Sequence, residues 1–319
     1  MLAVTLTEPN APLRVVADHP EPAADGEIID VTACGVCHSD LHVVDGDFPS
    51  PLPMILGHEV TGVHHQLGPV MVYAPWGCGS CRQCDEGLEM ICADATEAGL
   101  FADGGYAERM RVPSSRYLAP LGELDPVDAA PLACGGLTAH RAVSHTLETL
   151  RDRGSGARAL VVGAGGLGQY ALRYLRLLTD AHVVALDLAA DKRATALDLG
   201  AHEAVAPDDD IERCDVVIDF IGAPTTLIDS VEHVAKRGMV VVVGLAGGRV
   251  PFGLGAVPHE ARLMSSMWGS RTELDELLAF AHREPTIVQP VEVVPLASAQ
   301  VAHDRLRAGD VRGRLVLTP

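Results

Sequence analysis

The sequence predicts an α/β protein of two domains, one with a doubly wound parallel sheet and one consisting mainly of β-strands. Three observations support this fold class. The 319 residues exceed what one ordinary hydrophobic core accommodates. From Ala157 onward, short apolar strands alternate with helical segments, as in a parallel sheet covered by helices. Residues 1–135 instead contain short strand-like segments separated by many Pro and Gly residues.

The mainly β domain is expected to combine the beginning and the end of the chain. Its predicted elements are strands at 27–33 and 104–113 and helices at 125–131 and 273–283; a helix at 138–150 follows at the start of the second domain. After about Ser270, one helix and short strands return to this domain. We therefore place the domain boundaries at 1–135 with 270–319, and at 136–269.

Within the second domain, strands and helices begin to alternate at Ala157. Its predicted elements are a strand, a glycine turn and a helix over 157–178, a strand ending at Asp187, a helix at 191–199, a strand at 214–220, a helix at 225–235, and strands at 239–244 and 263–267. The segment 239–244 is a continuous apolar run, which is typical of a parallel strand covered on both faces.

A dinucleotide-binding turn lies in the first strand–helix unit of this domain. The candidate phosphate-binding residues are Gly163, Gly165, Gly166, Leu167 and Gly168. The three glycines of the GxGxxG pattern follow a strand, open a helix and precede Asp187 at the required spacing. A carboxylate there binds ribose hydroxyls and repels a 2′-phosphate, which favours NAD over NADP. Lys192 is a candidate contact to the adenosine ribose, although a solvated surface lysine is an equally good interpretation.

Three residues far apart in the sequence form a candidate metal site. Cys37 and His58 flank a Pro-rich turn, and Cys134 supplies a third ligand. Zinc bound by two cysteines and one histidine keeps its fourth tetrahedral position open for a substrate. Cys34 forms a CxxC pair with Cys37 and is expected to be a buried bystander.

A second cysteine cluster predicts a closed metal site. Cys78, Cys81, Cys84 and Cys92 have the spacing C-x₂-C-x₂-C-x₇-C. Four thiolates in one lobe suit a structural zinc ion, and an iron–sulfur cluster is the competing interpretation. Cys214 has no assigned role and is expected to be a small buried hydrophobic residue.

Composition excludes several classes of partner. The formal net charge of −19 repels nucleic-acid phosphates and anionic lipid surfaces. No apolar run approaches the ~20 residues of a membrane span, and no targeting segment is recognisable at the N-terminus. We expect a soluble cytoplasmic protein that binds neither nucleic acid nor membrane.

With these motifs placed, nearly the whole chain resembles the zinc-dependent alcohol dehydrogenases of the medium-chain dehydrogenase/reductase family, in particular the bacterial secondary-alcohol branch. The motifs stand in the family's order: GVCHSDLH, GHEVTG, GCGSCRQCDEG, GGYAE, AAPLACGGLTAH, VVGAGGLG, VVALD and VRGRLVL. The resemblance implies a GroES-like catalytic domain joined to a Rossmann NAD-binding domain, and the Cys₂His ligand set is the one associated with alcohol dehydrogenase.

The resemblance also implies roles for individual residues. Ser39 and His42 match a proton relay, Glu59 an acid behind the catalytic zinc, and Asp40 the carboxylate that orients the ligand histidine. The residues that match cofactor contacts are His38, Thr138, Gly244, Leu245 and Arg312. Trp268 matches a position that lines the substrate pocket, and an ordinary core tryptophan is an equally good interpretation.

The sequence departs from the family in two segments. The stretch after GHEVTG is shorter than usual and contains His64 and His65, which we expect to be surface residues. The segment 204–215 is also short, near the minimum for a parallel crossover, where relatives usually carry another helix.

The implied function is reversible hydride transfer between NAD and an alcohol, with one catalytic and one structural Zn²⁺ per chain. A secondary alcohol or ketone is the expected substrate, and a primary alcohol or aldehyde is the alternative. A zinc-free reductase of the same superfamily should lack the three ligands, and a non-catalytic NAD-binding zinc protein is the alternative from another class. The resemblance further implies a homodimer or homotetramer.

Overall fold

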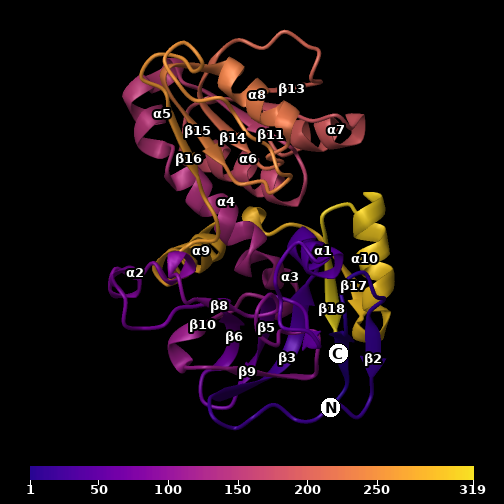
Figure 1. Cartoon of the computed structure of the whole chain (residues 1–319). Helices are drawn as coiled ribbons and strands as arrows, with labels where there is room; N and C mark the ends of the chain where they lie inside the picture. Colours follow the sequence, from indigo (N-terminus) through magenta and orange to yellow (C-terminus); the bar gives the residue numbers. More distant parts are fainter. The chain divides into compact units, whose positions relative to one another are not determined.

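The chain folds into two compact units, in a computed structural model that describes residues 1–319 (Figure 1). The discontinuous unit comprises Met1–Leu137 and Gly269–Pro319, and the inserted unit comprises Thr138–Trp268. The predicted fold class is confirmed, because one unit is mainly β and the other carries a parallel sheet with helices. The catalytic and NAD-binding roles given to the two domains remain predictions at this point.

The discontinuous unit is built on three sheets. Its first part contains β1 (Ala3–Leu6), β2 (Arg14–Val16), β3 (Glu27–Gly35), α1 (His38–Asp45), β4 (Met54–Ile55), β5 (Glu59–His64), β6 (Gly68–Val72), β7 (Pro75–Trp76), α2 (Arg82–Asp85), β8 (Thr96–Glu97), β9 (Arg109–Val112), β10 (Leu118–Pro120) and α3 (Pro126–Ala129). The C-terminal part adds α9 (Arg271–Arg283), β17 (Val291–Pro295), α10 (Ala299–Ala308) and β18 (Arg314–Thr318).

The largest sheet of this unit ties the two ends of the chain together. Its strand order is β10-β6-β5-β3-β18-β17, with β9 also paired to β3. β18 pairs antiparallel with β3, so that the last strand lies beside the strand that leads into α1. The smaller sheets have the orders β2-β1-β4 and β7-β8. The C-terminal part of the chain therefore contributes β18 as an internal strand of this sheet, between β3 and β17.

The inserted unit contains one parallel sheet with the order β13-β12-β11-β14-β15-β16. Its elements are α5 (Leu147–Arg153), β11 (Arg158–Val162), α6 (Gly166–Leu178), β12 (His182–Leu186), α7 (Ala190–Asp198), β13 (Glu203–Val205), β14 (Cys214–Asp219), α8 (Pro224–His233), β15 (Val234–Val242) and β16 (Arg262–Ser265). The strand order reverses between β11 and β14. In open parallel sheets, ligands bind at the carboxyl ends of the strands at such a switch point.

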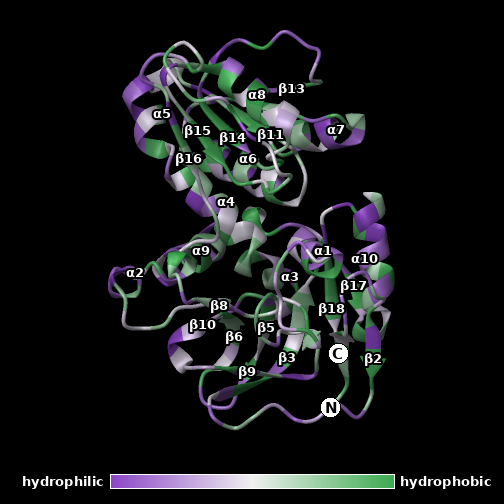
Figure 2. Cartoon of the chain, viewed as in Figure 1, coloured by the Kyte–Doolittle hydropathy of each residue, from purple (hydrophilic) through white to green (hydrophobic).

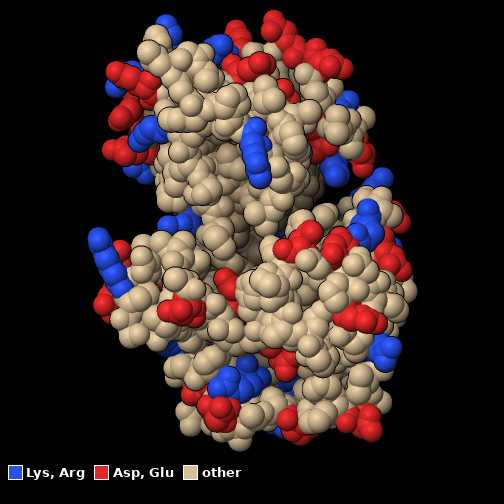
Figure 3. Space-filling model, in the orientation of Figure 1, with Lys and Arg blue, Asp and Glu red and all other residues tan.

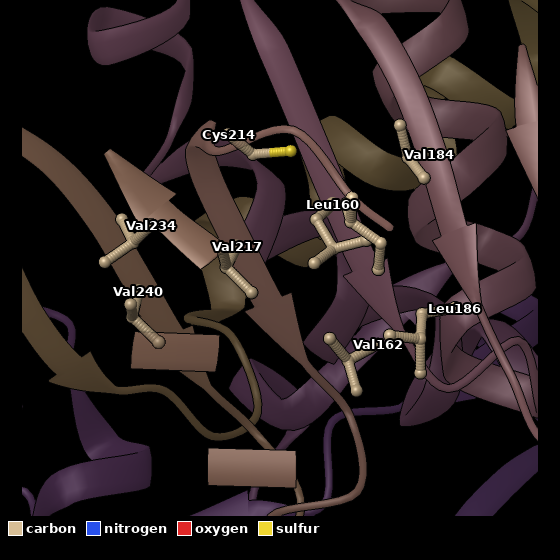
Figure 4. Packing of buried hydrophobic residues seen from close by; sticks show 9 residues of the cluster. Leu160, Val162, Val184, Leu186, Cys214, Val217, Val234 and Val240 are labelled. Atoms are coloured by element: carbon tan, nitrogen blue, oxygen red, sulfur yellow. The ribbon is translucent and has the colours of Figure 1, made fainter. Parts of the chain in front are cut away.

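The core of the inserted unit explains why its strands are continuous apolar runs. Leu160, Val162, Val184, Leu186 and Val217 are all buried and pack against one another (Figure 4). Their strands appear as hydrophobic segments between helices of mixed polarity in Figure 2. Because helices cover both faces of the sheet, neither face needs polar residues. Cys214 belongs to the same cluster, as a small buried residue.

Several predicted elements differ in their limits. The helix expected at 138–150 is divided into α4 (Gly135–Ser144) and α5, with a turn at His145 and Thr146. The strand expected at 104–113 is limited to β9, because residues 104–106 bond to the loop between β4 and β5. No helix occurs between β13 and β14, as expected for this short segment.

Charged side chains of both signs lie on the surface of the protein. Acidic and basic side chains are scattered over the face shown in Figure 3, and acidic groups gather at several points of its rim. None of the helices combines the length and the apolar character that a membrane span requires.

Candidate active site

The N-terminus of α1 positions the first metal-ligand candidate. Cys37 precedes the helix in an extended conformation, and its backbone N–H donates to Asp40 Oδ2 at 2.9 Å. The antiparallel pairing of β3 and β5 sets Gly35 opposite Glu59, which brings the His58–Glu59 pair beside Cys37. A Cβ at Gly35 would lie 2.0 Å from Glu59 Oε2, so only glycine permits this close approach.

The predicted ligands converge in a buried cluster. The donor atoms of Cys37, His58, Glu59 and Cys134 all lie within 4.8 Å of one another. All four residues are buried, and His58 and Glu59 are fully so. The structure thus brings the three predicted ligands together with the predicted acid behind them. Two sulfurs, one imidazole and one carboxylate form a donor set that suits Zn²⁺.

The electrostatics of this cluster also fit a cation. A hydrogen bond with Cys134 holds the pKa of the Cys37 thiol well below its usual range, whereas the same contact raises the pKa of Cys134. Burial raises the pKa of Glu59 to about 7, despite the opposing charge of Arg314. Burial lowers the pKa of His58, but Asp40 outweighs this effect and raises it overall. A divalent ion would stabilise the second thiolate, that of Cys134, which this desolvated site otherwise disfavours.

Two buried contacts support the cluster from behind. His58 Nδ1 lies 3.2 Å from Asp40 Oδ1, with both side chains fully buried. Arg314 Nη2 lies 2.6 Å from both carboxylate oxygens of Glu59. Arg314 was not identified from the sequence. A signal was present, because an arginine at the start of the apolar strand β18 requires a buried acid as a partner.

The predicted relay residues lie on α1, one turn apart. Cys37 Sγ lies 3.9 Å from Ser39 Oγ, which places this hydroxyl beside the cluster. His42 Nδ1 lies 2.7 Å from Asp47 Oδ2, and the imidazole remains about one third exposed. His38 is exposed on the same helix. The catalytic roles of Ser39, His42 and Glu59 remain predictions.

The four clustered cysteines form a second, more exposed group. The sulfur atoms of Cys78, Cys81, Cys84 and Cys92 lie within 4.8 Å of one another. Cys81 Sγ is 3.6 Å from both Cys84 Sγ and Cys92 Sγ. A hydrogen bond from the backbone of Ser80 lowers the pKa of Cys78 to about 6. Four sulfurs and no free position fit a structural Zn²⁺.

The glycine turn of the inserted unit has the features of a phosphate-binding loop. Gly163 adopts a φ of +89°, and a Cβ at Gly168 would lie 1.9 Å from the carbonyl oxygen of Gly163. Around Gly165, at the start of α6, a Cβ would meet no atom within 4 Å. Open space before a helix N-terminus suits an anion such as a pyrophosphate.

Asp187 lies at the end of β12, where it was expected. Its Oδ2 accepts a hydrogen bond from the N–H of Ala164 at 2.8 Å, and its Oδ1 accepts one from Ala189 at 2.9 Å. The carboxylate therefore holds the glycine turn in addition to its predicted role toward a ribose. Arg193 donates to the carbonyl oxygens of Asp187 and Leu188, each at 2.8 Å. The neighbouring Lys192, the predicted contact to the adenosine ribose, is half-buried.

The remaining candidates are placed without a defined ligand contact. Gly244 packs against the backbone of Ile221, and Leu245 is 62% exposed. Trp268 is buried and has a positive φ of 51°. Thr138 is buried, whereas Arg312 is exposed. Their proposed contacts to cofactor or substrate stay predictions.

One expectation in this region is wrong. His64 is not a surface residue, because only 2% of it is exposed and its Nε2 lies 3.1 Å from Glu27 Oε2. The shortened β5–β6 hairpin turns inward at this point, and Leu67 N–H donates to His64 Nδ1. His65 is exposed, as expected.

Known proteins are similar to this chain over its whole length. Residues 24–123 match the family model of the alcohol dehydrogenase GroES-like domain, and residues 166–283 match that of zinc-binding dehydrogenases. An alcohol dehydrogenase of Geobacillus stearothermophilus is 32% identical, with 99% of each chain covered. An NAD-dependent alcohol dehydrogenase of Sulfolobus acidocaldarius is 30% identical, again with 99% of each covered. The crystal structure of the Aeropyrum pernix alcohol dehydrogenase superposes with a TM-score of 0.88, at 32% identity and complete coverage of both chains.

Proposed function

The chain belongs to the zinc-dependent alcohol dehydrogenases of the medium-chain dehydrogenase/reductase family, and from this premise we propose that it oxidises small secondary alcohols reversibly to ketones with NAD. The observation that carries the proposal is the buried cluster of Cys37, His58, Glu59 and Cys134. Two sulfurs and one imidazole would hold the ion, and the carboxylate of Glu59 is paired with Arg314, so one position is left open for a substrate oxygen, which a closed structural site does not offer.

The bound groups and the protein divide the chemistry between them. Zn²⁺ held by Cys37, His58 and Cys134 supplies a Lewis acid for the substrate hydroxyl, and NAD supplies the hydride acceptor. The two thiolates offset the charge of the ion. Asp40 fixes the ring of His58 through the contact at 3.2 Å, and Arg314 keeps the carboxylate of Glu59 in place.

The residues of α1 provide a route for the hydroxyl proton. Ser39 lies beside the cluster, where its hydroxyl would accept the proton of the substrate hydroxyl and at the same time donate its own proton onward toward His42. His42 stands three positions later, on the same side of the helix, and exchanges the proton with solvent. The contact of its Nδ1 with Asp47 leaves Nε2 available for this exchange. Ser39 must be near the substrate oxygen and His42 near water. Neither side chain needs to carry a charge before the transfer.

The cofactor contacts follow from the inserted unit. The turn from Gly163 to Gly168 receives the pyrophosphate, and Asp187 receives the ribose hydroxyls. The carboxylate of Asp187 disfavours a 2′-phosphate, which supports NAD. The relatives named as NAD-dependent agree with this assignment. The assignments of His38, Thr138, Lys192, Gly244, Leu245, Arg312 and Trp268 are part of the same proposal.

The second zinc has a different task. The tetrad of Cys78, Cys81, Cys84 and Cys92 has no open position and holds the loop between β7 and β8. We further propose that the protein is cytoplasmic, because its eight cysteines are free thiols, and that it forms a homodimer or homotetramer through its cofactor domains, as the family resemblance implies.

Metal analysis combined with a substrate panel tests the proposed function. The purified protein should contain about two zinc per chain and should oxidise secondary alcohols with NAD faster than primary ones. Cys134→Ser should remove one zinc and abolish turnover. Cys214→Ala is the matched control, because this cysteine lies in the core of the inserted unit. A wild-type protein with one zinc and no turnover would point to a non-catalytic NAD-binding protein, and preference for primary alcohols would overturn the substrate class.

A further inference from the structure

A chain of buried polar groups connects the C-terminal helix α10 to His58. His303, on α10, places its Nε2 3.1 Å from the hydroxyl of Tyr106. The hydroxyl donates to Asp40 Oδ2 at 2.9 Å, and Asp40 Oδ1 lies 3.2 Å from His58 Nδ1. His303 is 3% exposed, and the other three residues are fully buried. Three contacts therefore lead from the helix to the ligand histidine without access to water.

The number of protons fixes the direction of each hydrogen bond. Tyr106 has one hydroxyl proton, and it points to the carboxylate of Asp40. Its oxygen must therefore accept from His303, which requires a proton on Nε2 of that imidazole. Asp40 Oδ2 accepts from the hydroxyl and from the backbone N–H of Cys37, and Asp40 Oδ1 lies 3.2 Å from His58 Nδ1. A carboxylate beside Nδ1 favours the tautomer of His58 that presents Nε2 to a metal ion.

The packing around Tyr106 makes this arrangement rigid. A Cβ at Gly57 would lie 2.4 Å from the ring of Tyr106, so the backbone of this loop is pressed against the aromatic face. The ring of His303 meets the ring of Tyr106 edge-on, with centroids 5.7 Å apart. A phenylalanine would fill the same space. A buried hydroxyl is costly unless it is hydrogen-bonded, so its presence here calls for a function beyond filling.

The helix that carries His303 is itself anchored to α1. Arg307 donates two hydrogen bonds to the carboxylate of Asp45, at 2.9 Å and 2.7 Å. Asp45 is the last residue of α1, and Asp40 lies in its first turn. The two helices are thus joined at the exposed end by an ion pair and at the buried end by the chain of His303 and Tyr106.

We propose that Tyr106 and His303 are positioning residues of the catalytic metal site, which act on His58 through Asp40. The inference rests on the proposed function only in taking His58 as a zinc ligand. Without the hydroxyl, Asp40 Oδ2 keeps a single donor, the N–H of Cys37, and the carboxylate can turn away from His58. The ligand ring then loses its fixed orientation, and the site binds metal less tightly.

Tyr106→Phe tests the proposal through the metal itself. Zinc affinity of the catalytic site, measured by competition with a chromophoric chelator, should fall about tenfold, the lower limit for partners that orient a ligand. The visible absorption bands of the Co²⁺-substituted site should shift, because they report ligand geometry. Tyr73→Phe is the matched control. It removes another buried tyrosine hydroxyl of the same unit, which donates to the carbonyl of Gly269, and should change neither readout.

A pair of substitutions at His303 separates hydrogen bonding from packing. His303→Leu removes the donor to Tyr106 and should shift the Co²⁺ bands as Tyr106→Phe does. His303→Gln retains an N–H donor at a similar distance from the backbone and should restore the wild-type spectrum and affinity. If His303→Gln and His303→Leu gave the same altered spectrum and affinity, the imidazole would act through packing and not through its hydrogen bond. This result would overturn the role of His303.

The outcomes distinguish this proposal from the proposed function. Unchanged zinc affinity and Co²⁺ spectrum in Tyr106→Phe would overturn the positioning role, whether or not the enzyme oxidises alcohols. Altered metal readouts in a protein that binds zinc but has no alcohol oxidation would support the positioning role and overturn the proposed activity. A wild-type chain in which His58 binds no metal would overturn both.

Discussion

The carboxylate of Glu59 depends on one buried cation. Arg314 contacts both of its oxygens at 2.6 Å, and the N–H of Gly135 donates to Oε1 at 3.2 Å. Arg314 is 5% exposed and Glu59 is fully buried. In such a pair, the attraction roughly offsets the desolvation of both charges, but removal of one partner leaves the other charge buried without compensation. The pair is therefore a sensitive point of the discontinuous unit.

We expect Arg314→Met to lower the free energy of unfolding by about 3–5 kcal/mol, the usual loss when one partner of a buried pair is removed. Denaturant unfolding of the zinc-loaded protein measures this change. Arg305→Met is the matched control, because the ion pair of Arg305 with Glu292 is solvent-exposed and should contribute little. Equal effects of the two substitutions would show that Arg314 is not energetically coupled to Glu59.

Asp187→Asn should reduce the preference for NAD over NADP. The single oxygen of Asn can still accept from the N–H of Ala164, which retains the hydrogen bond to the glycine turn, whereas the acceptor for the N–H of Ala189 is lost. The loss of the charge removes the repulsion of a 2′-phosphate and weakens the ribose contact. The ratio of kcat/KM values should fall roughly 10–100-fold, since hydrogen bonds to charged groups contribute about 1.5–3 kcal/mol. Asp191→Asn, at an exposed carboxylate of α7, should leave the ratio unchanged.

The metal-binding residues could be predicted from their residue types, but the residues that hold them in position could not. Cys37, His58 and Cys134 were identified because few other residue types bind zinc, whatever the fold. Arg314 and Tyr106 are common residues whose importance arises from what lies opposite them in the folded chain. Arg314 meets Glu59 only because β18 pairs with β3 and β3 with β5. This pairing joins parts of the sequence that no local pattern relates.

The cysteine lobe is the element that depends most on metal. Between β7 and β8 it contains only the short α2 and one 3₁₀ turn, and α2 has no buried residue. Its cysteine side chains contact one another more than a hydrophobic core. A segment with so little apolar burial needs a cross-link to remain ordered.

Cys81→Ser should therefore remove one zinc per chain and loosen residues 77–95, while the catalytic zinc remains bound. Cys81 is the residue with the closest sulfur contacts in the tetrad. Metal analysis should show about one zinc, and limited proteolysis should cut within the lobe at least about tenfold faster, because the open state is no longer opposed by metal binding. Asp85→Asn, at an exposed residue of α2 in the same lobe, is the control. An intact lobe with one zinc fewer would show that its order does not require the metal.

The limits of a helix can be predicted only where the sequence carries a recognisable start or stop signal. The helix predicted at 273–283 begins two residues earlier in the structure. The capping box of α9, Ser270 with Glu273, lies three residues before the predicted helix and fixes its start at Arg271. The break between α4 and α5 had no such signal. Thr146 instead bonds to the carbonyl of Val143 there, a local competition of side chain and backbone that propensity alone does not reveal.

For the whole molecule, the order of patterns along the chain predicted the fold. Apolar strands that alternate with helices are typical of a parallel sheet covered by helices. The architecture of the inserted unit was therefore predictable from its sequence. The discontinuous unit was predicted only as mainly β, because short strands interrupted by Gly and Pro do not specify their partners. Its strand order, with β18 between β3 and β17, became clear only from the structure.

The net charge of −19 gives a last prediction for the molecule as a whole. The chain has 43 acidic and 24 basic side chains. Folding brings the excess negative charges closer together, and the repulsion between them opposes the compact state. Salt screens it, since the Debye length falls to about 10 Å at 0.1 M. Salt also weakens surface ion pairs, but each of these contributes at most about 1 kcal/mol. Repulsion should therefore dominate.

Raising NaCl from low to physiological concentration at pH 7 should raise the Tm of the zinc-loaded protein by a few degrees, which corresponds to roughly 1 kcal/mol for a chain of this size. Scanning calorimetry or fluorescence measures the shift. The same titration near pH 5, the isoelectric point of about 5.0, is the control, because the excess charge is then small and the rise should vanish. A Tm that falls with salt at pH 7 would show that paired surface charges such as Arg305 with Glu292 outweigh the repulsion.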